Sequence, residues 1–259
     1  MPAYKPYLLR CPEYSVTSGG IRVMYGLYGH LLAKGQIAYM NAQYQTPDSV
    51  AIYPEIYWGN PAGANTVVRY ILQTPGKMGT TDQFGVFRQG PTTFDPKDQI
   101  FVFSKIYDTF GVDENHLMFL PVLNLYLFKD YKKKRNKTCY LVGKGINQFK
   151  HPKNSIELTR EFASDQKALA DLLNECQTFY CYDRLSAQME IARLCGCRVK
   201  YYGDFTKEDL TLYEPGMNGI TFKDEKDVKL DPGAFREHYK GMIKTFDQKM
   251  NNFIELTQK

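Results

Sequence analysis

Short apolar runs alternate along this chain with segments in which apolar residues recur at helical spacing. In the first half, an apolar run at 7–9 precedes a helix-like segment at 21–33, and strand-like runs follow at 36–40 and 49–53. A parallel strand pair needs a crossover connection, and a helix is its usual form. The order strand, helix, strand therefore predicts an α/β fold built on parallel sheets.

The rest of the first half continues this alternation. Residues 65–72 have the apolar spacing of a helix, and Pro75 and Gly76 follow shortly after them. Three further runs read as strands, at 85–87, 99–103 and 118–123. These runs extend the predicted sheet of the first half.

The segment from Lys129 to Lys137 is the sharpest change of composition in the chain, with six basic residues among nine. A solvated linker is the interpretation we favour over a nucleic-acid patch. We therefore predict an N-terminal domain at 1–131 and a C-terminal domain at 138–259. The second domain repeats the alternation, with strands expected at 138–142, 155–158, 178–182 and 198–202 and helices at 165–176, 186–194 and, as a long terminal helix, 233–256.

Composition narrows the class of protein. At 259 residues the chain has room for one large domain or two small ones, since a domain usually takes roughly 100–200 residues. Its net charge of +5 is too small to indicate a nucleic-acid partner. No apolar run reaches the ~20 residues of a membrane span, and the first residues lack a signal-peptide core. We therefore expect a soluble chain that is not exported.

The six cysteines form no C-x-x-C pair, and no spacing of cysteine and histidine matches a zinc site. We expect buried, reduced thiols, which is the usual state of cysteine in the cytosol. We also expect no bound metal. No histidine stands in a nucleophile motif such as G-x-S-x-G, so nothing in the sequence supports hydrolase chemistry.

A glycine–lysine–glycine turn, Gly143–Lys144–Gly145, follows the first predicted strand of the second half. Glycine lets backbone N–H groups approach a phosphate, and Lys144 adds a positive charge. The spacing fits neither the dinucleotide fingerprint, because Gln148 stands at its third glycine, nor a Walker loop. A diphosphate contact at Lys144 and Gly145 and a plain turn both remain open.

A second group of polar residues lies where the strand at 178–182 ends. Tyr182 and Asp183 stand at this end, and Ser186 opens the helix that follows. Ligands of open parallel sheets bind at the carboxyl ends of strands, and helix N-termini attract anions. Glu190, one turn further, is placed to accept hydrogen bonds from ribose hydroxyls. The alternative is a capping residue followed by a solvent-facing glutamate.

Three features of the first half match these. Gly19 and Gly20 precede the first helix and let a substrate approach the backbone. Glu55 directly follows the strand at 49–53, which makes it a candidate for acid/base work. Arg69 is expected on the next helix. An ordinary turn is the alternative for Gly19 and Gly20 and also for Glu55.

Taken together, these segments resemble nucleotide-sugar-dependent glycosyltransferases of the GT-B type, in particular those of bacterial polysaccharide synthesis. The resemblance is carried by 19–35, by 52–61 with 67–70 and 75–76, by 141–145, and by 179–197. It implies a compact fold of two Rossmann-like lobes, with a long C-terminal helix crossing back to the N-terminal lobe. It also implies sugar transfer in the cleft between the lobes, without a metal or another cofactor.

The resemblance also assigns roles to residues. Lys144, Gly145, Tyr182, Asp183, Ser186 and Glu190 would bind the donor, Gly19, Gly20 and Arg69 would lie on the acceptor side, and Glu55 would be catalytic. The implied partners are a nucleotide-sugar donor and a glycan or lipid-linked saccharide acceptor, not nucleic acid. The implied location is the cytoplasm, with peripheral contact to the inner membrane face as an open alternative.

Two other functions remain open. The first is another nucleotide-binding or nucleotide-sugar-binding α/β enzyme, such as an epimerase. The second is a non-catalytic carbohydrate-binding protein on a degenerate transferase fold. Tyr182 favours the second, because it stands where retaining members of the family carry the first of two glutamates.

Overall fold

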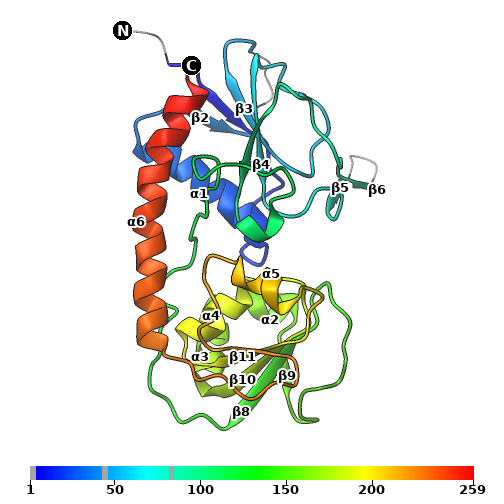
Figure 1. The fold of residues 1–259 in the computed structure, drawn as a ribbon, viewed down its shortest axis with the longest axis vertical. Helices are drawn as coiled ribbons and strands as arrows, with labels where there is room; N and C mark the ends of the chain where they lie inside the picture. The colour runs from blue at the N-terminus through cyan, green and yellow to red at the C-terminus, as the bar shows by residue number, and fades with distance from the viewer. Residues whose placement is uncertain (1–3, 43–45, 82–84) are drawn as a thin grey trace. The chain divides into compact units, whose positions relative to one another are not determined.

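The computed structural model describes residues 4–42, 46–81 and 85–259. It is a mixed α/β structure with two five-stranded sheets, both entirely parallel (Figure 1). The chain divides into two units. Unit 1 comprises Met1–Val122 together with Met242–Lys259, and unit 2 comprises Leu123–Gly241. The predicted α/β class with parallel sheets is therefore confirmed.

The sheet of unit 1 has the order β2-β1-β3-β4-β7. Its strands are β1 (Tyr7–Leu9), β2 (Ala38–Met40), β3 (Val50–Pro54), β4 (Thr66–Ile71) and β7 (Gln99–Val102). A separate antiparallel hairpin joins β5 (Gly79–Thr81) to β6 (Phe87–Gln89). The helix α1 (Gly19–Ala33) connects β1 to β2, and the short 3-10 helix η1 (Lys105–Tyr107) follows β7.

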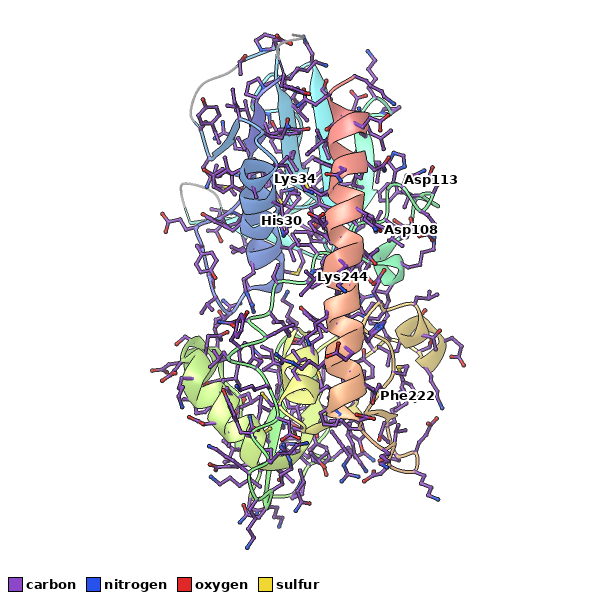
Figure 2. All side chains as sticks on the ribbon, turned by 90° about the vertical axis from the view of Figure 1, so that its left-hand side faces the viewer. His30, Lys34, Asp108, Asp113, Phe222 and Lys244 are labelled. Carbon is purple, nitrogen blue, oxygen red and sulfur yellow. The ribbon has the colours of Figure 1, made fainter. Side chains whose placement is uncertain are left out.

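Two helices contribute to the main core of unit 1, together with the strands of its sheet. Along α1 the buried residues Val23, Leu27 and Leu31 recur every fourth position, which places them on one face of the helix. The C-terminal part of the long helix α6 (Pro232–Thr257) lies beside α1 (Figures 1 and 2). It adds Phe246, Met250 and Phe253 to the same cluster. The core of unit 1 is therefore formed by residues from both the N-terminal and the C-terminal parts of the sequence.

The sheet of unit 2 has the order β12-β11-β10-β8-β9. Its strands are β8 (Lys137–Leu141), β9 (Ile156–Glu157), β10 (Cys176–Cys181), β11 (Arg198–Tyr201) and β12 (Ile220–Phe222). The connections contain α2 (Arg160–Ser164), α3 (Gln166–Glu175), α4 (Gln188–Leu194) and α5 (Lys207–Thr211). Within each sheet the second strand in the sequence lies on one side of the first, and the later strands lie on the other side.

The two faces of the unit 2 sheet differ in chemistry. Cys139, Phe179 and Val199 form one row across β8, β10 and β11, and all three are fully buried. The next row contains Tyr140, Tyr180 and Lys200, which are only half-buried. The described connection from β8 to β9 contains no helix. A loop therefore takes the place of the usual crossover helix between these two strands, beside the tyrosine row.

Two predicted elements of unit 1 are wrong. Residues 65–72, predicted as a helix, contain the strand β4, which pairs with β3 and β7 and is buried along almost its whole length. Its residues Thr66, Val67, Val68 and Ile71 are β-branched, and such side chains favour a strand. Residues 118–123, predicted as a strand, contain no strand, although the adjacent Leu117 makes one bridge to Val102.

The other predicted elements largely agree with the structure. Helices are confirmed at 21–33, 165–176, 186–194 and 233–256, with small differences at their ends. In the part of the chain that the structure describes, no helix combines the length and apolar character needed to cross a membrane.

Candidate functional site

The candidate site of unit 2 lies at the point where the strand order of its sheet reverses. After β8 the chain goes to β9 on one side, and it then returns to β10 on the other side of β8. The carboxyl ends of β8 and β10 therefore lie next to each other, with the loops that follow them. In open parallel sheets this position is the usual place for a ligand. It is also where Lys144, Gly145, Tyr182 and Asp183 stand.

These two loops pack tightly together. Gly143 has a φ of 56°, and a Cβ atom there would collide with the carboxylate of Asp183. A Cβ atom on Gly145 would collide with the carbonyl oxygen of Tyr182. Both glycines are therefore required by the close approach of the loops. The structure therefore places the glycine–lysine–glycine turn next to the Tyr182–Asp183 pair, at the carboxyl ends of β8 and β10.

Asp183 anchors this turn. Its Oδ2 atom accepts a hydrogen bond of 3.1 Å from the backbone N–H of Lys144. Burial raises the pKa of the Asp183 carboxyl, and the hydrogen bond from Lys144 opposes this shift. The side chain of Lys144 is exposed, so its charge is carried at the surface of the edge. The backbone of the turn is thus fixed by Asp183.

The hydroxyl of Tyr182 holds the remainder of the β8–β9 loop. It accepts hydrogen bonds from the backbone N–H groups of Lys150 (2.9 Å) and His151 (3.1 Å), and it lies 2.8 Å from Nδ1 of His151. The His151 ring stacks on Tyr140, with 3.8 Å between ring centroids and 8° between planes. Neither His151 nor Tyr140 was among the predicted site residues. The chain contains 20 tyrosines, and this abundance is the one sequence feature that could have pointed to Tyr140.

Ser186 and Glu190 both form hydrogen bonds with other residues of unit 2. The N-cap residue of α4 is Ala187, and Ser186 lies one position before it, so the predicted capping role of Ser186 is wrong. The Ser186 hydroxyl instead accepts a hydrogen bond of 3.2 Å from the backbone N–H of Gln188. Glu190 is buried, and its Oε1 accepts a hydrogen bond from the hydroxyl of Tyr213. The role of Glu190 toward a ribose stays a prediction.

The sheet of unit 1 has the same arrangement of strands as that of unit 2, and its strand order reverses between β1 and β3. Glu55 directly follows β3 and is only 4% exposed. Its Oε2 atom accepts a hydrogen bond of 2.9 Å from the backbone N–H of Leu72, which directly follows β4. The carboxylate therefore joins the ends of two neighbouring strands, and its catalytic role stays a prediction.

Arg69 lies on β4, not on a helix, and is almost completely buried. Its Nε forms a 2.6 Å ion pair with Asp98. Its two terminal nitrogens donate to the carbonyl oxygens of Tyr57 (3.1 Å) and Gly59 (2.6 Å). The guanidinium also lies over the rings of Tyr53 and Phe94. These contacts account for the burial of its charge and fix the segment after Glu55.

Gly19 and Gly20 form the first residues of α1. A Cβ atom on Gly19 would meet nothing within 4 Å, and one on Gly20 would lie 3.5 Å from the side chain of Leu72. Packing in this structure therefore does not require glycine at either position. Their acceptor-side role stays a prediction.

A depression of about 560 Å³ lies at the opposite edge of the unit 2 sheet. It is lined by the starts of β10 and β11, through Gln177 and Arg198, and by Arg135 and Lys229. Arg198 is paired with Asp227 at 3.1 Å, and Arg135 donates to three carbonyl oxygens. Both arginines therefore already have partners. Among the described residues no cluster of three His, Cys, Asp or Glu side chains is arranged to hold a metal ion.

Comparisons with known proteins give structural neighbours only. No protein-family model matches the chain, and no curated protein matches it in sequence. An uncharacterized protein of Klebsiella pneumoniae is 11% identical, with a TM-score of 0.45 over 86% of this chain and 94% of that one. The C-terminal part of Escherichia coli RcsC, with its linker region and phosphoreceiver domain, is 11% identical, with a TM-score of 0.26 over 95% and 94%. Neither similarity assigns a function.

Proposed function

We propose that the chain is a glycosyltransferase of the GT-B type, which moves a sugar from a nucleotide-sugar to a hydroxyl acceptor without a metal. Unit 2 is the donor-binding lobe and unit 1 the acceptor-side lobe, both Rossmann-like. The proposal is supported most by the pairing of the Gly143–Gly145 turn with Tyr182 and Asp183. That pairing stands at the strand ends where a parallel sheet of this order accepts a ligand.

The chemistry follows from the charges at this edge. During transfer, the bond between the anomeric carbon and the diphosphate oxygen breaks, and its electron pair stays on the diphosphate. A new bond forms between the anomeric carbon and the acceptor oxygen, whose proton passes to a base. The exposed ammonium of Lys144 stabilises the charge that develops on the diphosphate. Glu55 is the proposed base on the acceptor side.

The role of Asp183 is to fix the turn. Its hydrogen bond to the N–H of Lys144 and its fit against Gly143 hold the turn before a donor arrives. A preformed turn lowers the ordering cost of binding, since little backbone freedom is lost.

Thermal shift and isothermal titration with UDP-, GDP-, ADP- and dTDP-sugars test the donor site. We expect at least one donor to bind, and Lys144→Ala to weaken its binding at least about ten-fold, because a charge-assisted contact to phosphate is lost. Lys153→Ala is the matched control, since it removes another exposed lysine from the same β8–β9 loop. Unchanged affinity in Lys144→Ala would remove the diphosphate assignment.

Donor hydrolysis in the absence of an acceptor separates the alternatives. A glycosyltransferase releases free sugar slowly from its donor, whereas a non-catalytic binding protein releases none. An epimerase would instead convert the donor into a second nucleotide-sugar, which chromatography resolves. Either of these last two results would count against the proposal.

A further inference from the structure

The only tryptophan in the sequence, Trp58, lies on the surface of unit 1, and the residue is 64% exposed. It stands three residues after Glu55, in the segment between β3 and β4. Tryptophan is usually largely buried, because exposing an indole to water forgoes a large hydrophobic gain. An exposed indole so close to the proposed acceptor side calls for a physical reason.

The backbone around Trp58 is clamped from inside the protein. The carbonyl oxygens of the residues on either side, Tyr57 and Gly59, both accept hydrogen bonds from the buried guanidinium of Arg69. Arg69 is itself fixed by its ion pair with Asp98, in which both side chains are almost completely buried. The exposed residue is therefore carried on a rigid base.

The indole is fixed as well. Its Nε1–H donates a hydrogen bond of 2.9 Å to the carbonyl oxygen of Gln89 at the end of β6. The next residue, Gly90, lets this hairpin approach the segment after β3. A Cβ atom there would lie 2.9 Å from Cα of Ile56 and 3.0 Å from the carbonyl oxygen of Glu55. The polar edge of the indole is thus satisfied by the hairpin, while most of the side chain stays in contact with solvent.

From these contacts we infer that Trp58 is a stacking platform for a sugar ring of a saccharide acceptor, an inference that rests on the proposed glycosyltransferase function. The C–H bonds of a pyranose carry partial positive charge and lie well on the negative face of an aromatic ring. Phe87 on β6, two residues before Gln89, is also 64% exposed.

The surroundings favour a saccharide over a lipid surface. The residues beside the two rings in the sequence, Asn60, Arg88 and Gln89, are exposed and polar, and a polar surrounding suits a hydroxylated ligand better than a lipid tail. The side-chain amides of Asn60 and Gln89 form hydrogen bonds within unit 1, so they border the rings in the sequence and already have partners. Clamping an aromatic ring from below reduces the entropy lost when a ligand stacks on it, and this benefits a specific ring contact. Insertion into a bilayer gains nothing from a fixed orientation of the backbone.

Because Trp58 is the only tryptophan, its fluorescence reports directly on this surface. The protein is titrated with maltohexaose, cellohexaose, laminarihexaose, mannohexaose and chitohexaose, without a donor. We expect a saturable change of emission with at least one of them. The affinity of that saccharide is then measured by isothermal titration. It should fall about ten-fold in Trp58→Ala and stay nearly unchanged in Trp58→Phe, which retains a ring.

Tyr126→Ala is the control, since it removes an aromatic side chain that is 89% exposed in unit 2. Circular dichroism establishes that each variant is folded. No saturable response to any of the five saccharides, or equal affinity in Trp58→Ala, overturns the inference. So does a response to vesicles of phosphatidylcholine and phosphatidylglycerol alone. Donor binding is measured separately through Lys144, so a failed saccharide titration beside intact donor binding overturns this inference and not the proposed function.

Discussion

At the scale of single residues, Arg193 connects several elements of unit 2. It is completely buried on α4, and burial lowers its pKa to about 10. Its Nη1 donates to the carbonyl oxygens of Pro215, Gly216 and Asn218, with Gly216 closest at 2.6 Å. Its guanidinium lies 4.0 Å from the centre of the Phe235 ring. One planar cation therefore joins α4, the segment at 215–218 and the start of α6.

Replacing this cation should strongly destabilise unit 2. Arg193→Met leaves one buried and two partly buried carbonyl oxygens without their donor and Glu190 without its nearby cation, so we expect a loss of about 3–5 kcal/mol in the free energy of unfolding. Arg193→Lys should not restore it, because one ammonium cannot replace both the Nε bond to Met189 and the Nη1 bonds to these oxygens. Urea unfolding followed by circular dichroism measures both. Arg160→Met, at an exposed arginine of α2, is the control, and a loss below about 1 kcal/mol in Arg193→Met would contradict the prediction.

The candidate site residues differ in how far their contacts can be predicted from the sequence. Lys144 and Asp183 follow directly from the sequence, because both stand where predicted parallel strands end, and such ends share one edge. The partner of Glu190 does not follow, because Tyr213 is 23 residues away and is brought to it by tertiary packing alone. The buried clamp made by Arg69 was missed for a similar reason, since its acceptors are backbone atoms and carry no sequence signal.

At the scale of elements, most helices and strands were predictable, and β4 shows why some were not. A strand buried on both faces loses the alternation of polar and apolar residues that identifies a half-exposed strand. Val67, Val68 and Ile71 then fit the spacing of a short helix equally well. The decisive information is the pairing of β4 between β3 and β7, which is a property of the sheet and not of the segment.

The contact between α1 and α6 in unit 1 should be sensitive to acid. His30 lies on α1, and Lys34 directly follows that helix (Figure 2). His30 lies edge-on to Phe246 on α6, with 4.9 Å between ring centroids, and Lys34 pairs with Asp247 at 2.7 Å. Burial lowers the pKa of His30 below its ordinary value of 6.5, with Asp247 opposing the shift and Lys34 adding to it. The neutral ring is therefore the form that fits this contact.

A lowered histidine pKa fixes the sign of the pH effect. The unfolded chain binds the proton more readily, so the contribution of His30 to stability is complete above pH 6.5 and is lost as the pH falls through its lowered pKa. We expect His30→Leu to reduce the drop in melting temperature between pH 7.5 and pH 5, as measured by calorimetry at each pH. His238→Leu, on the unit 2 part of α6, should retain the wild-type drop. An equal drop in His30→Leu and wild type would contradict this.

At the scale of the whole molecule, unit 1 is assembled from both ends of the chain. The hydroxyls of Tyr7 and Thr257 are 2.8 Å apart in the buried core, although they are 250 residues apart in the sequence. Phe253 stacks on Tyr7, with 6.1 Å between centroids, and meets Phe101 edge-on at 4.8 Å. Unit 2 is inserted between the two segments that form this core. The stability of unit 1 therefore depends on the C-terminal residues of α6.

Phe253→Ala tests this dependence. Removing a fully buried ring from the core should cost about 3–5 kcal/mol, because the transfer free energy is lost and a cavity remains. Trp58 lies in unit 1, so its fluorescence follows the unfolding of that unit in urea, and its midpoint should fall. Lys244→Ala changes an exposed residue of the same helix and should leave the midpoint unchanged (Figure 2). An unchanged midpoint in Phe253→Ala would show that the first 122 residues hold their core without the C-terminal segment.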